Sequence, residues 1–300
     1  MCKVLNLNRS TYYKDSKHKP TKTQISNDEL DSKILKVYYD SKKRYGAPKI
    51  FKVLQNEGGT ASLKRIQRRM TVLGIKSVVV KKYKPVKVGK SVEQKVNILN
   101  QDFSTTSINQ KWCTDITYIH TEKEGWTYLA SVEDLYSRKI IGWAFGKTID
   151  AELAVKALKN AVLNVKHTEG IIIQSDLGCQ YTSNLFESTL AELKIRHSYS
   201  KKGYPYDNSC IESFHSVLKK EEVNLKKYKD SKEAYNAIFE YIESWYNRRR
   251  IHSSLNYRTP EAVYSEYKKS SVSTLKIKKG EKLTNFAQPR TPDQLQFSGG

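Results

Sequence analysis

The sequence is poor in cysteine and lacks long apolar runs, and each shortage excludes a class of protein. Its 300 residues contain four cysteines, too few for a disulfide framework and without the CxxC spacing of a zinc site. No apolar run approaches the roughly 18 residues of a membrane-spanning helix. The first residues hold no apolar stretch typical of a secretory signal. We therefore expect a cytoplasmic protein with no membrane partner.

Acidic residues are scarce beside basic ones, and the imbalance is regional. Asp and Glu number 31 against 53 Lys and Arg, which gives a formal net charge of +22. Residues 1–100 hold 24 basic and 7 acidic side chains, whereas residues 101–228 hold 16 of each. A basic part followed by a neutral part favours a polyanion-binding segment joined to a segment with another task. Lysines that serve only solubility are the alternative.

The basic part has the pattern of a helical DNA-binding domain. Apolar spacing predicts one helix from Asn27, a second over residues 49–56 and a third that Ser62 caps and Gly74 ends. The third helix follows a Gly-containing turn, as the recognition helix of a helix-turn-helix does. Its basic residues are candidate DNA contacts: Lys64, Arg65, Arg68 and Arg69. A helical hairpin with a solvated basic face is the alternative.

The neutral part reads as an α/β domain. Residues 112–120, 126–132 and 139–145 predict strands, and they are followed by a helix, a strand, a helix and a strand up to residue 199. Two further helices are expected at residues 208–225 and 231–247. This order is typical of a mixed sheet covered by helices. The predicted organisation is a flexible segment (1–26), a helix-turn-helix domain (27–80), a basic linker (81–105), the α/β domain (106–268) and a disordered tail (269–300).

Three carboxylates stand out in the α/β domain. Asp115 lies within a β-rich run, Asp176 ends an apolar strand, and Glu212 lies near the start of a predicted helix. Each has an ordinary alternative. Asp115 could hydrogen-bond a neighbouring Thr, Asp176 could be a strand-to-turn Asp, and Glu212 could form a capping box with Ser209. Together they can converge at one edge of the sheet. Clustered carboxylates repel one another unless a cation neutralises them.

Hard carboxylate oxygens suit Mg²⁺ or Mn²⁺. Two such ions can stabilise both the attacking and the leaving oxygen of a phosphoryl displacement. With a basic DNA-binding segment in the same chain, DNA is the natural phosphodiester substrate. The three carboxylates are therefore both the candidate catalytic residues and the candidate metal ligands.

At these residues the sequence resembles a known family. Asp115, Asp176 and Glu212, with 35 residues between the last two, are similar to the DDE triad of retroviral-integrase-like transposases. The sequence motifs around these residues are more specific and resemble the second-frame transposase of IS3-family insertion sequences. They read WCTDITYI, QSDLGCQYTS, GYPYDNSCIESFHSVLKKE and YNRRRIHSSLNYRTPEAV. The resemblance covers residues 28–265.

The resemblance implies a fold, an activity and partners. The fold would be an RNase-H-like core preceded by an all-α helix-turn-helix domain. The activity would be cleavage of double-stranded DNA at the element ends and strand transfer, with two Mg²⁺ ions for which Mn²⁺ can substitute. The partners would be DNA, a second copy of the chain and an upstream-frame protein, fused or separate. The setting would be the bacterial cytoplasm, at the nucleoid.

Four more residues are candidate DNA contacts on the resemblance. Lys219 follows Glu212 by seven positions, so the two share a helix face. Asn208 precedes Glu212 by one turn, and capping explains it equally well. Arg250 and His252 lie in the YNRRRIH segment, where a helix C-terminus also favours basic side chains. His215 and the cysteines near the acids are interpreted as packing residues.

Two other functions remain open from the sequence. One is a DNA-binding repressor with an inactive core, against which the intact triad and Lys219 argue. The other is a nuclease that cuts but does not join, against which the helix-turn-helix and the YNRRRIH segment argue.

Overall fold

A computed structural model describes residues 10, 21–78, 96–163, 165–201 and 205–270. Most of the predicted N-terminal segment, of the basic linker and of the tail lies outside the described residues. The chain splits into two compact units, Met1–Lys82 and Tyr83–Gly300. No helix among the described residues is long and apolar enough to cross a membrane.

Residues 21–78 of the first unit contain three helices, α2 (Lys22–Asp40), α3 (Ala47–Asn56) and α4 (Leu63–Val72). Their apolar faces form a small core. Its fully buried side chains are Ile34, Ile50 and Ile66. Ser62 caps α4 and Gly74 follows it with φ +64°, so the predicted helix ends are confirmed.

The start of α2 differs from the prediction. We expected the helix to begin at Asn27, but it begins at Lys22. Thr21 is the N-cap, and its side chain and that of Gln24 form a capping box. This box satisfies the first backbone N–H groups, so the helix extends one and a half turns beyond the first apolar stripe. The signal was present in the sequence but lay upstream of the apolar periodicity.

The second unit is built on a five-stranded mixed sheet. Strands β1 (Lys111–Thr121), β2 (Gly125–Asp134) and β3 (Ile140–Gly146) pair antiparallel in a meander. Strands β4 (Ile172–Ser175) and β5 (Arg196–Tyr199) join β1 in parallel. The order across the sheet is β3-β2-β1-β4-β5. The predicted α/β fold with a mixed sheet is confirmed.

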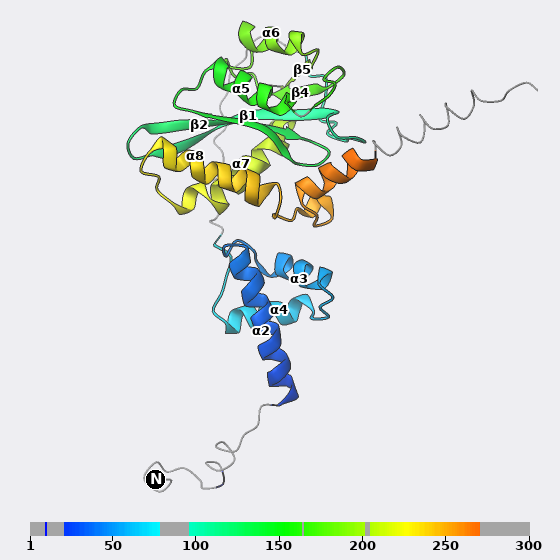
Figure 1. Cartoon of the computed structure of the whole chain (residues 1–300), viewed down its shortest axis with the longest axis vertical. Coiled ribbons are helices and arrows are strands. Elements are labelled where there is room, and N and C mark those ends of the chain that lie inside the picture. Colours follow the sequence, from blue (N-terminus) through cyan, green and yellow to red (C-terminus); the bar gives the residue numbers. More distant parts are fainter. Residues whose placement is uncertain (1–9, 11–20, 79–95, 164, 202–204, 271–300) are drawn as a thin grey trace, which may run out of the picture. The chain divides into compact units, whose positions relative to one another are not determined.

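Helices cover both faces of this sheet (Figure 1). On one face lie α5 (Ala151–Val162) and α6 (Asn184–Glu192), and on the other α7 (Ser209–Glu221) and α8 (Ser231–Phe239). The main core lies between the sheet and α5, where Gly142 allows close approach. A Cβ on Gly142 would come within 2.5 Å of the Ala157 carbonyl oxygen. Short 3-10 turns η1 (Pro205–Asn208), η2 (Val223–Leu225) and η4 (Ser253–Leu255) connect the later elements, and a helix over residues 260–270 ends the described part.

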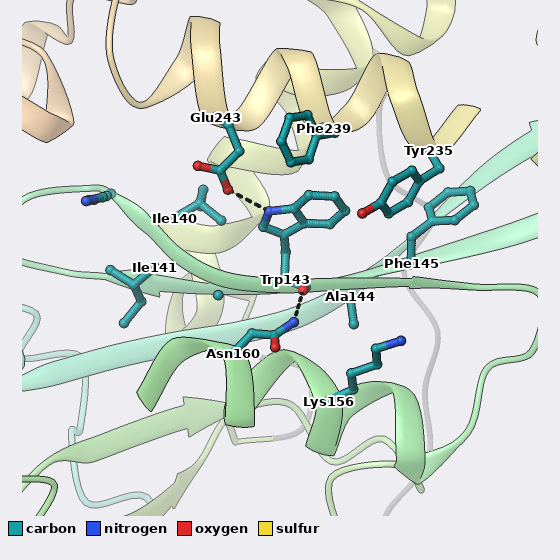
Figure 2. Close-up of a pocket in the computed structure, with 12 residues that line it drawn as sticks. Ile140, Ile141, Trp143, Ala144, Phe145, Lys156, Asn160, Tyr235, Phe239 and Glu243 are labelled. Atoms are coloured by element: carbon teal, nitrogen blue, oxygen red, sulfur yellow. Dashed lines mark hydrogen bonds between the residues drawn. The ribbon is translucent and has the colours of Figure 1, made fainter. Parts of the chain in front are cut away.

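Side chains from both layers cover the edge strand β3 (Figure 2). The Asn160 amide of α5 donates to the Trp143 carbonyl at 2.9 Å, and the Trp143 indole N–H donates to Glu243 at 2.9 Å. Tyr235 and Phe239 pack against the indole, with ring centroids 5.5 and 6.2 Å from it. The Asn160 bond occupies one backbone carbonyl of this edge strand, and the same side chains line a pocket of about 350 Å³.

A buried polar network holds the end of α7. Helix α8 continues into a π-helical segment, η3 (Glu240–Tyr246), so the predicted helix at 231–247 changes its winding for its last turns. Tyr241 and Trp245 of this segment donate to Glu221 at 3.0 and 3.2 Å. The Arg250 guanidinium contacts both Glu221 oxygens at 3.0–3.1 Å. Because Glu221 and Arg250 are both buried, this network is an internal link between α7 and the C-terminal helices.

The network predicts unequal costs for two neighbouring arginines. Arg250→Ala would leave the Glu221 carboxylate buried without its counterion, so we expect the free energy of unfolding to fall by about 3–5 kcal/mol. Arg248→Ala removes an exposed side chain and should cost less than about 0.5 kcal/mol. Urea unfolding followed by tryptophan fluorescence tests this, because all four tryptophans lie in the second unit. Equal losses for the two variants would contradict the assignment.

Candidate active site

The sheet brings two of the three predicted carboxylates together. The parallel pairing of β1 with β4 ends at Cys113 opposite Gln174. Asp115 and Asp176 each lie two residues beyond that last pair, one on each chain. Parallel strands carry equivalent positions to the same edge, which places both acids where the two strands part.

Asp115 is held by contacts that the sequence did not reveal. One carboxylate oxygen, Oδ2, lies 3.3 Å from Nδ1 of His215 on α7, and the other accepts the Ile116 N–H at 2.8 Å. The Nε2 atom of His215 lies 3.0 Å from the hydroxyl of Ser131, which is the β2 partner of Asp115 in the register. His215 is buried, as a packing residue would be, but it also connects α7 with β1 and β2 at the site.

Asp176 lies in a tight turn after β4. Its Oδ1 accepts the Gly178 N–H at 2.9 Å, so the alternative of a strand-to-turn Asp describes its local geometry correctly. A Cβ on Gly178 would lie 3.0 Å from the same oxygen, which favours glycine there. Burial raises the pKa of Asp176, and the charge of Asp115 raises it further. A role only in capping its own turn would not explain why Asp176 lies close enough to Asp115 for the charge of Asp115 to raise its pKa.

Glu212 projects from the first turns of α7. The helix begins at Ser209 with Asn208 as N-cap, so Ser209 is not the cap and the capping-box alternative is wrong. Partial burial raises the pKa of Glu212, and the charges of Asp115 and Asp176 raise it further. The three predicted carboxylates therefore act on one another electrostatically.

The donor set fits a hard divalent cation. All three groups offer carboxylate oxygens, and their mutual repulsion is the condition that a bound cation relieves. In the conformation described, no three His, Cys, Asp or Glu side chains among the described residues are grouped closely enough to hold a metal ion. Asp115 Oδ2 faces His215, and Asp176 Oδ1 accepts the Gly178 N–H.

Lys219 and Asn208 lie on the same helix as Glu212 or at its start. Lys219 is half-buried, and its pKa is lowered by burial while the charge of Asp115 opposes that effect. Asn208 is buried beside β1, and its amide lies 3.5 Å from the Thr114 carbonyl. It occupies the N-cap position without a side-chain capping bond. Its Oδ1 is buried without a hydrogen-bond partner among the described residues.

The basic residues of α4 fall into two groups. Arg69 forms an ion pair with Asp31 of α2, and Arg65 donates to Ser26 and Asn27 at 2.9 Å. Lys64 and Arg68 are exposed. The latter two side chains are therefore the ones that point away from the helical unit.

The remaining predicted residues have internal contacts. Arg250 belongs to the buried Glu221 network, and His252 lies in a turn where its Nδ1 contacts the Ser254 hydroxyl at 2.8 Å. Cys113 and Cys210 contact one another beneath the carboxylates, Cys113 being buried and Cys210 partly so. Thus the cysteines next to the acids pack as predicted, whereas Cys179 is exposed.

Comparisons with known proteins find family models that match both parts of the chain. An integrase core domain model matches residues 106–205, a second integrase core domain model matches residues 193–260, and an HTH-like domain model matches residues 26–83. The chain is 38% identical over 244 residues to the transposase for insertion sequence element IS904 of Lactococcus lactis, which covers 81% of this chain and 96% of that protein. It is 36% identical over 266 residues to transposase InsF of insertion sequence IS3A of Escherichia coli, covering 87% and 91%.

A more distant likeness is to a solved integrase. The catalytic core domain of HTLV-2 integrase, determined in complex with magnesium, aligns with a TM-score of 0.41 and 16% identity, covering 53% of this chain and 97% of that one. The two bacterial relatives, matched over nearly their whole lengths, decide the assignment: the chain belongs to the IS3 family of insertion-sequence transposases, polynucleotidyl transferases with an integrase catalytic core.

Proposed function

We propose that Asp115, Asp176 and Glu212 are the catalytic residues with which this transposase cuts DNA at the ends of its element and joins the freed ends to new DNA. The observation that carries the proposal is the equivalent position of Asp115 and Asp176 beyond the last β1–β4 pair, with Glu212 close enough to feel both charges. The same three groups would hold Mg²⁺, two ions in the working complex, with Mn²⁺ as a substitute. Such ions polarise the reacting phosphodiester and lower the pKa of the attacking water or hydroxyl.

The chain's own side chains have separate tasks in this proposal. Lys219 binds a DNA phosphate beside the carboxylates, because its ammonium lies on the same helix face as Glu212. Asn208 offers its buried amide oxygen to substrate or water. His215 positions Asp115 through the contact of its Nδ1 with Oδ2. Lys64 and Arg68 contact the phosphates or base edges of the duplex.

The partners follow from the reaction. Two element ends must be brought together, so we propose at least a dimer of this chain on double-stranded DNA, with an upstream-frame protein contributing to end recognition. The reaction takes place in the bacterial cytoplasm, where the chromosome lies. The domain boundaries at residues 27–80 and 106–268 are proposed on the same basis. Contacts of Arg69, Arg250 and His252 with DNA remain predictions that their internal bonds do not support.

Removal of any one carboxylate charge should stop the chemistry but not the binding. For Asp115→Asn, Asp176→Asn and Glu212→Gln we expect cleavage and joining to fall by at least about a hundredfold, because each loses a charge that stabilises the reacting centre. The substrate is a labelled duplex with the inverted repeats that flank the gene, with Mg²⁺ or with EDTA, and joined products are scored separately from nicks. DNA affinity should change little.

Glu192→Gln is the matched control, since Glu192 is an exposed acid on α6. Full activity of Asp176→Asn would refute the triad. Nicking without joining, even after the upstream-frame protein is added, would favour the plain nuclease, and binding without either reaction in the wild-type complex would favour the repressor.

His215 gives a further test of the site. His215→Ala removes the contact with Asp115 Oδ2, so we expect the cleavage rate to fall about tenfold, which corresponds to about 1.4 kcal/mol of lost transition-state stabilisation, while the Kd for DNA stays the same. His215→Asn should recover part of the rate, because its amide nitrogen can occupy the place of Nδ1. If Asn is no better than Ala, or if the Kd changes as much as the rate, His215 is only a packing residue.

A further inference from the structure

A groove of about 710 Å³ lies beside the β1–β2 hairpin and has no role in the chemistry proposed above. Tyr118, His120 and Trp126 of the hairpin line one side. The end of α7 and the segment after it line the other, with Lys219, Lys226 and Lys227. Lys219 lies on α7, seven residues after Glu212 and on the same face of the helix, so the groove lies next to the candidate active site.

The topology of the sheet leaves this groove open. β4 stops pairing with β1 at Cys113, and no described strand lies against that edge of β1 beyond this point. The far wall is fixed to the hairpin by backbone bonds. The N–H of Glu122 donates to the Tyr228 carbonyl at 2.9 Å, and that of Lys123 donates to the Lys229 carbonyl at 3.0 Å. One wall of the groove is therefore held by the β1–β2 pairing, and the other is held by these backbone hydrogen bonds to the hairpin.

Aromatic rings in the groove are exposed yet held in place. Trp126 is 58% exposed and Tyr118 is 48% exposed. Trp126 meets Tyr118 edge to face at 6.3 Å between centroids and His120 at 5.1 Å. Exposing a large indole to water is unfavourable, and its neighbours fix its orientation without covering it. Rigid aromatic surface beside an active site is the kind of surface on which a planar group stacks.

The charge of the groove favours an anionic ligand. Its lining carries three lysines and one carboxylate, Glu122. Lys226 is positioned by Glu222 at 2.7 Å yet keeps its side chain 57% exposed, and Lys227 is exposed. A line of ammonium groups next to exposed rings matches a nucleic-acid strand, in which phosphates and planar bases alternate. An acidic peptide would match the lysines but would not need the rings.

We propose that this groove binds an unpaired stretch of DNA strand next to the cleaved phosphodiester. A base stacks on Trp126 and Tyr118 while its flanking phosphates lie against Lys219 and Lys227. A base within an intact duplex has both faces covered by its neighbours, so the groove favours DNA that is frayed or opened at the reacting position. The location of this strand relative to the cleavage point rests on the proposed function; the binding itself does not.

The test uses the full chain and a defined probe. A ten-nucleotide oligothymidine with one 5-iodouracil, and a hairpin duplex of similar length, are titrated with wild-type protein and variants. We expect Trp126→Ala to weaken binding of the single strand about tenfold, the scale of base–aromatic stacking, and binding of the duplex less than twofold. Trp126→Phe should retain most of the affinity. Photo-crosslinks should map to residues 118–126.

Matched controls separate the groove from general surface effects. Tyr235→Ala removes a comparably exposed aromatic ring on α8, and Lys232→Gln removes an exposed lysine there; neither should change single-strand binding. Lys227→Gln should weaken it and reduce its salt dependence. Unchanged affinity of Trp126→Ala, or crosslinks that map elsewhere, would overturn the proposal, including in favour of a protein ligand.

The same experiment distinguishes this inference from the proposed chemistry. Asp176→Asn should bind the single strand like the wild type because it leaves the groove unchanged. If Asp176→Asn still cleaves DNA, the proposed function fails while the binding result stands. If Asp176→Asn is inactive and Trp126→Ala binds normally, the chemistry stands and the groove proposal fails.

Discussion

Electrostatic repulsion among Asp115, Asp176 and Glu212 is the constraint on which the rest of the catalytic unit depends. Burial together with the neighbouring charges raises the pKa of Asp176 and of Glu212. An acid whose pKa is higher in the folded than in the unfolded chain favours folding only while it is protonated. That contribution is lost as the pH rises through the folded-state pKa. The repulsion is therefore strongest when all three carboxylates are ionised, which is the state that a bound cation would neutralise.

Helix α7 must be held against the sheet even though it has a charged residue, Glu212, near its start. Ile211, Phe214 and Leu218 are buried on one side of the helix. His215 ties its middle to Asp115 and Ser131, and Glu221 ties its end to Arg250. Buried apolar side chains fix the distance of the helix from β1, whereas the polar contacts fix its rotation and its position along its axis. Rotation decides whether Glu212 faces the other acids.

Local signals in the sequence were sufficient to predict most of the fold. They could not predict the contacts between residues that lie far apart in the sequence. The strands were predictable because β-branched, aromatic and other apolar residues are concentrated in short runs, and α4 because Ser62 and Gly74 mark its ends. The start of α2 was missed because its capping box precedes a turn whose single apolar residue, Ile25, is exposed. Arg250 was predicted to contact DNA, and its bond to Glu221 could not be predicted because Glu221 lies 29 residues earlier.

The same distinction applies to the site. Glu212 was predicted to be a functional acid from the sequence motif around it. Its alternative as a capping residue was excluded only by the structure, in which η1 occupies residues 205–208 and Asn208 is the N-cap of α7. The contact of His215 with Asp115 joins residues 100 positions apart, so no local pattern encodes it. Spacing along the chain can therefore predict candidate catalytic acids, but it cannot identify a distant residue that contacts one of them in the fold.

One topological feature explains both the candidate active site and the groove beside it. β1 is eleven residues long and β4 is four, so their pairing ends while β1 continues into the hairpin. The two strands part at Asp115 and Asp176, which gives the carboxylates room for ions and a phosphodiester. The longer strand then presents an open edge with Tyr118 and His120, and the segment after α7 closes the far side. In the proposed complex, a nucleic-acid strand that reaches the carboxylates along this edge meets Lys219 before it meets the acids. The difference in strand length would then create both the proposed reaction site and the groove that leads to it, and lengthening β4 would close both.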